Sequence, residues 1–357
     1  MNISQIVLYR YAIPFTEPIT VKEQRLTERE GIVISLADAN GDAVGFGEIA
    51  PLPGLHNESI EQAENEIIKL LAQRTISVPC MMKQPLYPSV RTGLEIALLN
   101  LAAALSGNLP TLCSCANNAQ QVPVNALLFG SPEEVVQRAE ELFQAGYRTF
   151  KLKVNASNSA HALASINALQ NRFGNSITLR LDANQSFHFD DAVAFGKALP
   201  IGSIAYIEEP LDDASRIGDF YAATAIPSAL DETLWQHPEL LESIPTKALA
   251  ALVLRPSRLG GISSAEHFAR YANEHGLLAV FSSAFESGIS LGCYSWLAAS
   301  CSAEPAACGL DTHRYLKHDL LTTPFPTDTP LLDASECYRD SLQVNLRALK
   351  RRSVWTL

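Results

Sequence analysis

The chain has 357 residues, of which 47% are hydrophobic and 18% are charged, and its formal net charge at pH 7 is −11. That length accommodates one large barrel and a smaller domain, and the composition is ordinary for a soluble, well-packed enzyme. The negative charge disfavours nucleic acid and anionic membrane surfaces as partners, because both repel an acidic protein.

No segment of the sequence predicts a membrane span or a secretory leader. The uncharged apolar runs stay below the roughly 18 residues that cross a bilayer. Residues 1–15 lack the basic start, the long apolar core and the small-residue cleavage site of a signal peptide. We therefore expect a cytoplasmic protein.

The cysteines do not form a recognisable metal or disulfide pattern. Seven are scattered along the chain: Cys80, Cys113, Cys115, Cys293, Cys301, Cys308 and Cys337. Only Cys113 and Cys115 are close together, and a C-x-C without a second pair is a poor zinc site. We expect small, buried hydrophobic residues in a reducing cytoplasm.

Residues 1–110 are predicted to form an α+β domain. Two β-rich runs and two amphipathic helical stretches lie in this part, at 6–15, 31–51, 59–73 and 91–107. The last helix is closed by Gly107 and followed by Pro110, which is a typical helix end.

From Val122 onwards, short β-rich runs alternate with helical stretches. The runs are 122–130, 149–154, 177–183, 204–210, 226–232, 251–257, 277–285 and 307–312. Eight strands at this spacing favour a closed α/β barrel over residues 111–315 rather than a doubly wound open sheet. No G-x-G-x-x-G follows the first run, which removes the main support for a dinucleotide-binding fold. Residues 316–357 are expected to pack back against the first domain.

Three acidic residues stand at the ends of successive apolar runs. Asp182 and Glu208 are 26 residues apart, and Asp231 follows 23 residues later, about one strand–helix repeat each time. Carboxylates gathered at one barrel mouth repel one another unless a cation holds them, and oxygen ligands select a hard ion such as Mg²⁺. Helix caps or turn acceptors are the structural alternative. Glu208 competes with Glu209, and Asp231 with Glu232, because alternation lets only one of each pair face inward.

Lys151 and Lys153 lie one strand earlier. Alternate side chains of a strand share a face, so both lysines are predicted to point into the barrel mouth. Two ammonium groups side by side near a divalent cation depress each other's pKa, and such a lysine acts as a base near neutral pH. Lys153, next to the strand end, is the better candidate for the base.

Two further patterns carry weaker signals. Gly260 and Gly261 are not followed by a lysine in P-loop spacing, so we expect a tight strand-to-helix turn rather than a phosphate site. The eight histidines form no ligand spacing. His56 is expected at the surface, with a contact to the barrel mouth as the alternative.

The motifs Lys-x-Lys, Asp-Ala-Asn, Glu-Glu-Pro, Asp-Glu and Pro-Ser-x-x-Gly-Gly, in this order, resemble the enolase superfamily in its muconate-lactonizing subgroup. The resemblance covers nearly the whole chain. It implies a (β/α)7β TIM-like barrel with an α+β capping domain built from residues 1–110 and 316–357, whose loop is residues 15–27. It further implies that Glu208 and Asp231 join Asp182 in binding Mg²⁺, with Mn²⁺ as a substitute. The ion then holds a substrate carboxylate while a lysine removes the α-proton.

Within the subgroup, several stretches look most like o-succinylbenzoate synthases. They are PFTEPITVKEQRLTEREG, GFGEIAPLPGL, LRLDANQSF, FSSAFESGISLG and GLDTHRYLKHDLL. By this likeness Ser282, Ser283 and Gly309 lie near the substrate carboxylates, and Arg180 and Asn184 are also assigned to substrate binding. A role of the serines as hydrogen-bonding groups at a strand end is left open.

Arg255 stands where the family usually has a second lysine. A guanidinium is effectively never deprotonated, so Arg255 cannot be a base. Racemases of this subgroup need a base on each face of the carbanion, whereas a syn elimination needs only one. Arg255 can still contribute as a catalytic residue by its charge or by stacking over a planar group. The substitution therefore counts against racemisation and is compatible with dehydration.

The first hypothesis is a Mg²⁺-dependent lyase that dehydrates 2-succinyl-6-hydroxy-2,4-cyclohexadiene-1-carboxylate to 2-succinylbenzoate, in menaquinone or phylloquinone biosynthesis. An N-succinylamino acid racemase, a dipeptide epimerase or a muconate cycloisomerase is the alternative within the same fold. A catalytically inactive, metal-binding barrel is the alternative outside enzymes. The expected partner is a small carboxylate substrate, and the sequence gives no oligomeric state.

Overall fold

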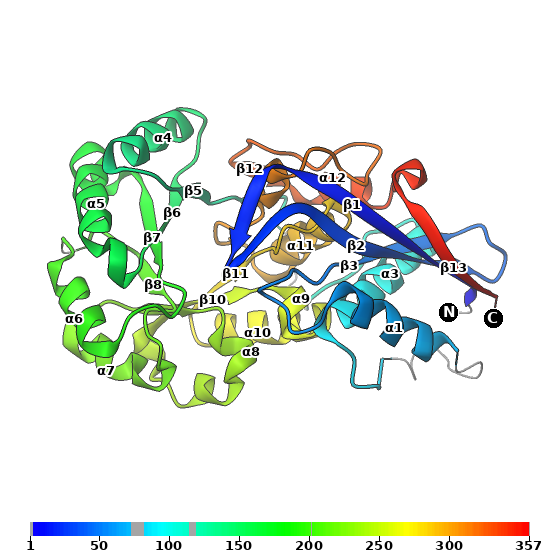
Figure 1. The fold of residues 1–357 in the computed structure, drawn as a ribbon, viewed down its shortest axis with the longest axis horizontal. Coiled ribbons are helices and arrows are strands. Elements are labelled where there is room, and N and C mark those ends of the chain that lie inside the picture. The colour runs from blue at the N-terminus through cyan, green and yellow to red at the C-terminus, as the bar shows by residue number, and fades with distance from the viewer. Residues whose placement is uncertain (1–2, 73–81, 114–118, 201, 357) are drawn as a thin grey trace.

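The chain begins and ends in the same antiparallel sheet. The computed structural model describes residues 3–72, 82–113, 119–200 and 202–356, and the order of this N-terminal sheet is β13-β1-β2-β3. Its strands are β1 (Ile3–Val21), β2 (Gln24–Asp38), β3 (Val44–Ile49) and β13 (Lys350–Thr356). Gln5 lies opposite Thr356, so the two ends of the described chain are neighbours (Figure 1).

Two helices, α1 (Ile60–Leu71) and α3 (Pro88–Ser106), pack on the N-terminal sheet. Glycine on β3 lets α3 lie directly against the strand, because a Cβ on Gly47 would stand 1.9 Å from the carbonyl oxygen of Gly93. The predicted end of α3 is confirmed, since Gly107 closes the helix in the left-handed conformation. The sheet and its helices share one apolar core.

The second part of the chain forms a parallel sheet in the order β11-β10-β9-β8-β7-β6-β5. The strands are β5 (Ala126–Leu128), β6 (Thr149–Lys153), β7 (Thr178–Asp182), β8 (Tyr206–Glu208), β9 (Ser228–Leu230), β10 (Leu249–Leu254) and β11 (Leu278–Phe281). Parallel bridges from Cys308 to Val124 and from Gly309 to Ser282 close the ring at the eighth position. The predicted fold class, a (β/α)7β barrel with an α+β cap, is confirmed.

The last predicted strand is shorter than expected. Residues 307–312 pair with their neighbours through single bridges rather than a ladder. Gly309 passes so close to β11 that a Cβ there would lie 2.9 Å from the hydroxyl oxygen of Ser282. The first predicted run is split, because β4 (Gln121–Pro123) leaves the barrel to pair with β12 (Leu331–Asp333).

Helices connect the strands and surround the barrel, with α4 to α7 at the left of Figure 1. They are α4 (Pro132–Gln144), α5 (Ser159–Phe173), α6 (Phe189–Ala198), α7 (Ile217–Thr224), α8 (Thr233–Gln236), α9 (Pro256–Leu259), α10 (Ile262–Glu274), α11 (Gly288–Cys301) and α12 (Ala334–Ser341). The predicted cap of α4 is confirmed, since Ser131 and Glu134 form a reciprocal capping box.

The turn predicted at Gly260 and Gly261 joins α9 to α10, and both glycines have positive φ. Glu95 of α3 fills the space beside it: a Cβ on Gly261 would lie 2.4 Å from a carboxylate oxygen of Glu95. That oxygen accepts the backbone N–H of Ser263 at 3.0 Å. The glycine turn therefore leaves the space in which Glu95 of the cap contacts the barrel.

His56 lies between cap and barrel, so the expectation of a surface position is wrong. Burial, with Arg258 and Arg29 nearby, lowers the pKa of His56 and keeps the ring neutral. Its Nδ1 accepts the N–H of Leu52 at 2.9 Å, and its Nε2–H donates to the carbonyl of Ser257 at 3.1 Å. The ring therefore joins the segment after β3 to helix α9, which follows β10.

Arg29 makes a second connection between cap and barrel. The side chain is buried, and its guanidinium donates to the carbonyls of Glu30, Ala50 and Pro51 in the cap. Its Nε donates across to the carbonyl of Phe285, which follows β11, at 3.1 Å. A buried cation with this many acceptors fixes the strand β2 against the barrel loop.

The cysteine prediction is wrong for one pair. Cys113 and Cys301 form a disulfide that ties the segment after α3 to the end of α11. The two residues are 188 positions apart, so only the folded chain brings them together. Cys293, Cys308 and Cys337 are buried free thiols, as expected. Cys80 and Cys115 lie outside the described residues.

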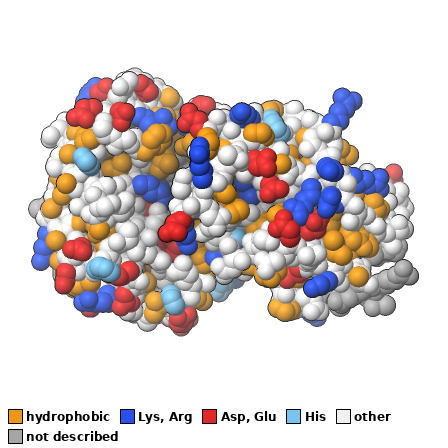
Figure 2. All heavy atoms as spheres, in the orientation of Figure 1, with side chains coloured by type: hydrophobic (Ala, Val, Ile, Leu, Met, Phe, Trp, Pro, Cys, Tyr) orange, Lys and Arg blue, Asp and Glu red, His pale blue; other side chains and the backbone are white. Residues whose placement is uncertain are grey.

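Charged side chains of both signs are interspersed on the face drawn in Figure 2. Arg10 of β1 and Arg352 of β13 pair with Glu64 of α1, at nitrogen–oxygen distances of 2.8 and 3.4 Å. Within the part of the chain that the structure describes, no helix combines the length and the apolar character needed to cross a bilayer.

Candidate active site

The three predicted carboxylates stand at the carboxyl ends of neighbouring strands. Asp182 ends β7, Glu208 ends β8, and Asp231 directly follows β9. Asp182 and Glu208 face each other in the strand register, and all three side chains are buried. The apolar strands therefore bring three acidic groups to one end of the barrel, as their spacing predicts.

Lys151 lies between two of these carboxylates. Its Nζ is 2.7 Å from Asp182 and 2.8 Å from Glu208. Burial alone would lower the pKa of Lys151, but the two carboxylates raise it above the usual range. The expectation that the neighbouring lysine depresses this pKa is therefore wrong for Lys151, because the facing carboxylates outweigh it.

Lys153 lies in the same strand row as Asp182 and Glu208, since the register places it opposite Asp182. Its Nζ is 2.7 Å from Asp182 and also donates to the side-chain oxygen of Asn184. The amide nitrogen of Asn184 donates to Glu232 at 3.0 Å, so a chain of bonds orients the amine. The side chain of Lys153 is 47% exposed, against 14% for Lys151.

Arg255, which follows the adjacent strand β10, holds Asp231. Its Nε lies 3.0 and 2.9 Å from the two carboxylate oxygens, and its Nη2 lies 2.8 Å from one of them. Its Nη1 donates to the carbonyl of Ser283 at 2.6 Å. Burial raises the pKa of Asp231, and the charge of Arg255 opposes that rise.

The carboxylate oxygens of Asp182, Glu208 and Asp231 fit a hard divalent ion, although in the structure they are bonded to lysine and arginine side chains. Burial and the adjacent Asp182 raise the pKa of Glu208, which shows that the carboxylates crowd one another and require compensating positive charge. Lysine and arginine provide that charge here. Across the described residues, no three His, Cys, Asp or Glu side chains stand close enough to hold an ion as they are placed. Binding an ion requires Asp182, Glu208 and Asp231 to exchange cationic partners for it.

The competition between Glu208 and Glu209 is resolved by their contacts. Glu208 bonds to Lys151, whereas Glu209 turns away and accepts hydrogen bonds from Asp231, Thr233 and Gln185. Burial and the nearby Glu232 raise the pKa of Glu209 to about 7. The alternation of side chains predicts that only one of the two faces inward, which agrees with these contacts, but no sequence signal says which one.

The predicted substrate residues divide into two groups. Ser282, Ser283 and Gly309 meet where β11 approaches the closing segment, and the Ser283 hydroxyl bonds to the Gly309 carbonyl at 3.0 Å and to Thr312 at 2.8 Å. Arg180 lies one layer deeper than Asp182.

Arg180 shares its strand row with Lys151 and Tyr206. The side chain is buried, its Nη1 donates to the carbonyl of Ala307 at 2.6 Å, and its guanidinium covers the Tyr206 ring at 5.3 Å. These contacts fill the barrel interior below the carboxylates, so they do not support the predicted contact between Arg180 and substrate.

Three aromatic rings that the sequence analysis did not single out lie on the cap side of the barrel. Phe285 follows β11 with a positive φ, and its ring packs edge-on against Phe15 at 5.7 Å and Tyr315 at 5.8 Å. Phe15 belongs to β1, and it also forms a bridge with Leu316. The expectation of a loop at residues 15–27 is wrong, because this segment is the end of the hairpin formed by β1 and β2, and Phe15 brings it against the barrel.

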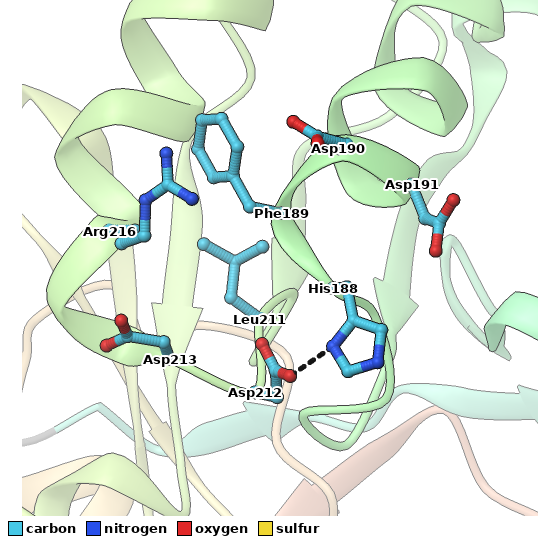
Figure 3. Close-up of a pocket in the computed structure, with 8 residues that line it drawn as sticks. All are labelled: His188, Phe189, Asp190, Asp191, Leu211, Asp212, Asp213 and Arg216. Carbon is cyan, nitrogen blue, oxygen red and sulfur yellow. Dashed lines mark hydrogen bonds and ion pairs between the residues drawn. The ribbon is translucent and has the colours of Figure 1, made fainter.

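A separate recess opens on the outside of the barrel, beside the loops that follow β7 and β8 (Figure 3). His188 bonds to Asp212 across these loops, and the guanidinium of Arg216 lies 3.4 Å from the Phe189 ring centroid. The side chains of His188 and Asp212 are largely exposed, and the recess contains none of the predicted site residues. It is a surface feature rather than the catalytic mouth.

Comparisons with known proteins identify the family. The family model described as "Enolase C-terminal domain-like" matches residues 134–336, and the one described as "MenC, N-terminal domain" matches residues 3–101. The chain belongs to the enolase superfamily. The resemblance inferred from the Lys-x-Lys and Glu-Glu-Pro motifs is confirmed.

Two curated relatives are each 31% identical to this chain. One is the o-succinylbenzoate synthase of Yersinia pseudotuberculosis serotype O:1b (strain IP 31758), with an alignment of 334 residues that covers 91% of this chain and 94% of the relative. The other is the chloroplastic protein PHYLLO of Arabidopsis thaliana, with an alignment 369 positions long that covers 90% of this chain and 21% of that protein. The similarity supports an enzyme, an o-succinylbenzoate synthase or one of related activity.

Solved structures of the enolase superfamily have the same fold. A substrate-liganded L-Ala-D/L-Glu epimerase from Bacillus subtilis has a TM-score of 0.81 at 23% identity, over 93% of this chain and 96% of that chain. A dipeptide epimerase from Enterococcus faecalis V583, complexed with Mg and the dipeptide L-Leu-L-Tyr, has a TM-score of 0.81 at 21% identity, over 98% and 100% of the two chains.

Proposed function

We propose that the chain is an o-succinylbenzoate synthase. It would dehydrate 2-succinyl-6-hydroxy-2,4-cyclohexadiene-1-carboxylate to 2-succinylbenzoate, a step of menaquinone or phylloquinone biosynthesis. The observation that carries the proposal is the contrast between the two cations expected on opposite faces of the substrate. Lys153 is half exposed, whereas Arg255 is bound to Asp231 and cannot accept a proton. One usable base supports a syn elimination rather than a racemisation.

Asp182, Glu208 and Asp231 are the residues that would hold Mg²⁺ in this proposal. The ion, when bound, supplies positive charge where negative charge develops on the substrate carboxylate. An α-proton beside a carboxylate is far too weakly acidic for an unaided amine, so this charge is a requirement of the chemistry. Lys151, buried between Asp182 and Glu208, bonds to both acids, and its charge opposes the rise that burial causes in the pKa of Glu208.

Lys153 is the proposed base. Its Nζ takes the proton from the carbon that bears the carboxylate, and Asn184 orients the amine for this step. The same ammonium group then returns the proton to the hydroxyl on the adjacent ring carbon. That C–O bond breaks, a ring double bond forms and water leaves. Arg255 contributes a fixed positive charge through its position and takes part in no proton transfer.

The experiment is to assay dehydration and racemisation side by side on the purified full chain with Mg²⁺. We expect rapid dehydration of the cyclohexadiene acid and slow or one-sided exchange of the α-proton of N-succinylamino acids with solvent deuterium. A folded protein that fails to dehydrate this acid would contradict the proposal. Equal exchange from both enantiomers would favour the racemase or epimerase alternative.

The alternative of an inactive metal-binding barrel makes a different prediction. It requires that a Lys153→Ala variant behave like the wild type in every assay. We expect instead that this variant keeps its metal affinity and loses its turnover.

A further inference from the structure

Glu209 occupies an unusual position for a carboxylate beside a catalytic mouth. It follows Glu208 directly, its side chain is fully buried, and its backbone has a φ of 44°. A positive φ is uncommon outside glycine and persists where surrounding contacts hold it. The backbone is held on both sides, since its N–H donates to Ala229 at 2.9 Å and its carbonyl accepts from Gln185 at 2.8 Å.

The carboxylate of Glu209 connects the loops after three consecutive strands. One oxygen accepts the backbone N–H groups of Asp231 and Thr233, both at 2.7 Å. The other accepts the hydroxyl of Thr233 at 2.7 Å and the side-chain amide of Gln185 at 3.0 Å. Gln185 follows β7, Glu209 follows β8 and Thr233 follows β9, so a single side chain holds the three loops together.

These contacts act directly on a proposed metal ligand. The backbone of Asp231 is bound by Glu209, while its carboxylate is bound by Arg255. Glu209 therefore fixes the backbone of Asp231, so that an exchange of Arg255 for an ion would involve the side chain of Asp231. Glu209 has all its oxygens occupied and no exposure, so it acts on the substrate only through other residues.

We infer that Glu209 is a positioning residue for the divalent ion, which fixes the backbone of Asp231 so that the ligand set stays preorganised. The inference rests on the proposed function, because it presumes that Asp231 is a metal ligand. Partners behind metal ligands typically contribute 10- to 100-fold in metal affinity or activity. A role in folding alone would instead affect stability and leave metal affinity unchanged.

The decisive variants alter the hydrogen bonds of Glu209 with the least change of shape. Glu209→Gln removes the negative charge and puts an amide donor in place of the oxygen that accepts from Thr233 and Gln185. The double variant Glu209→Gln with Gln185→Glu restores a donor and an acceptor and conserves charge. Thr233→Val removes one donor and keeps the side-chain volume, which makes it a milder variant if Glu209→Gln folds poorly.

The control variant is Asp212→Asn. The bond between His188 and Asp212 joins the same two loops as the bond between Gln185 and Glu209, but it lies at the exposed rim of the recess in Figure 3. Its loss tests whether any weakening of the loop pairing is enough to disturb the metal site.

The experiment measures Mn²⁺ affinity of the folded proteins by titration calorimetry, together with thermal unfolding in the presence of a chelator. We expect Glu209→Gln to weaken Mn²⁺ binding by roughly 10- to 100-fold. We expect Thr233→Val to weaken it less, and the double variant and Asp212→Asn to bind like the wild type. Wild-type affinity in Glu209→Gln, with or without a lower unfolding temperature, would overturn the inference, as would a double variant as weak as Glu209→Gln.

A failure of the proposed metal site, on which the proposed function depends, gives a different result. In that case the wild type binds no Mn²⁺, or Asp182→Asn binds it as tightly as the wild type. A failure of the dehydration assay with intact Mn²⁺ binding would instead reject the proposed reaction and leave the role of Glu209 standing. If Asp182→Asn binds Mn²⁺ more weakly while Glu209→Gln binds it like the wild type, the metal site stands and only the positioning role of Glu209 is rejected.

Discussion

Arg255 and Asp231 form a buried, forked ion pair across two adjacent strands, with nitrogen–oxygen distances between 2.8 and 3.0 Å. A guanidinium matches a carboxylate in this geometry better than an ammonium does. The pair explains how a chain of this family can carry arginine at a position where a base is otherwise expected. Burial raises the pKa of Asp231, and the charge of Arg255 opposes that rise.

Removal of this cation is expected to destabilise the protein. Arg255→Met leaves Asp231 buried without its partner, and loss of one member of a buried pair typically costs about 3–5 kcal/mol. Urea unfolding at pH 7 measures the change in the free energy of unfolding. Added Mg²⁺ should recover part of the loss, because the ion supplies the missing charge at Asp231.

The matched control for this prediction is Arg172→Met. Arg172 pairs with Glu140 on the surface, with side-chain exposures of 58% and 42%. Exposed pairs contribute about 0–1 kcal/mol. If Arg255→Met were no more destabilising than Arg172→Met, the buried pair would not have the role described.

Lys153→Arg separates the charge of the proposed base from its ability to accept a proton. The variant keeps a cation near Asp182 and Asn184 but removes the basic amine. We expect the dehydration rate to fall by roughly 10²- to 10⁴-fold, the usual contribution of general base catalysis. Single-turnover kinetics at saturating Mg²⁺ measures the loss.

Retained turnover in Lys153→Arg would place the base elsewhere, with Lys151 as the nearest amine. The corresponding Lys151→Arg variant keeps a cation between Asp182 and Glu208. We expect it to weaken metal binding more than Lys153→Arg does, because Lys151 contacts two of the proposed ligands.

The position of the site follows from local rules that act along the sequence. Alternation along β6 places Lys151 and Lys153 on one face, and the strand–helix spacing places Asp182 and Glu208 at adjacent strand ends. Both rules need only the sequence. The structure therefore agrees with the predicted strand positions, while the metal and substrate roles of these residues stay predictions.

Other features depend on contacts that no local rule specifies. The role of Glu209 depends on a positive φ and on partners 22 to 24 residues away in the sequence. The raised pKa of Lys151 depends on two carboxylates on other strands. The disulfide between Cys113 and Cys301 joins residues 188 positions apart. Each of these is a property of tertiary packing, which the apolar pattern determines only in outline.

The glycine on β3 provides a test of the cap. A Cβ on Gly47 would lie 1.9 Å from the carbonyl oxygen of Gly93, so Gly47→Ala must displace α3 from the sheet. Overpacking of this kind costs about 1–3 kcal/mol and occasionally more. Thermal unfolding measures the loss.

Gly41→Ala is the control for Gly47→Ala, because Gly41 has a φ of 78° and no atom within 4 Å of an added Cβ. Backbone strain alone should lower the free energy of unfolding of Gly41→Ala by about 1 kcal/mol. A Gly47→Ala variant no less stable than Gly41→Ala would contradict the close contact between β3 and α3.

Asp319 is expected to make the folded state sensitive to acid. Burial alone would raise the pKa of Asp319, but His313 and the backbone N–H groups of Phe325 and Gly288 hold it below the usual value. A carboxyl whose pKa is depressed by folding stabilises the protein above its unfolded pKa, about 4. That stabilisation is lost as the pH falls from there towards the folded pKa. Urea unfolding from about pH 7 to about pH 3 should therefore show a steep loss of stability below about pH 4 in the wild type and a shallower one in Asp319→Asn.

Asp333→Asn is the comparison, because the pKa of Asp333 is also lowered but the group is exposed, so its effect should be smaller. Equal slopes for the wild type and Asp319→Asn would show that these buried bonds do not contribute to the pH dependence.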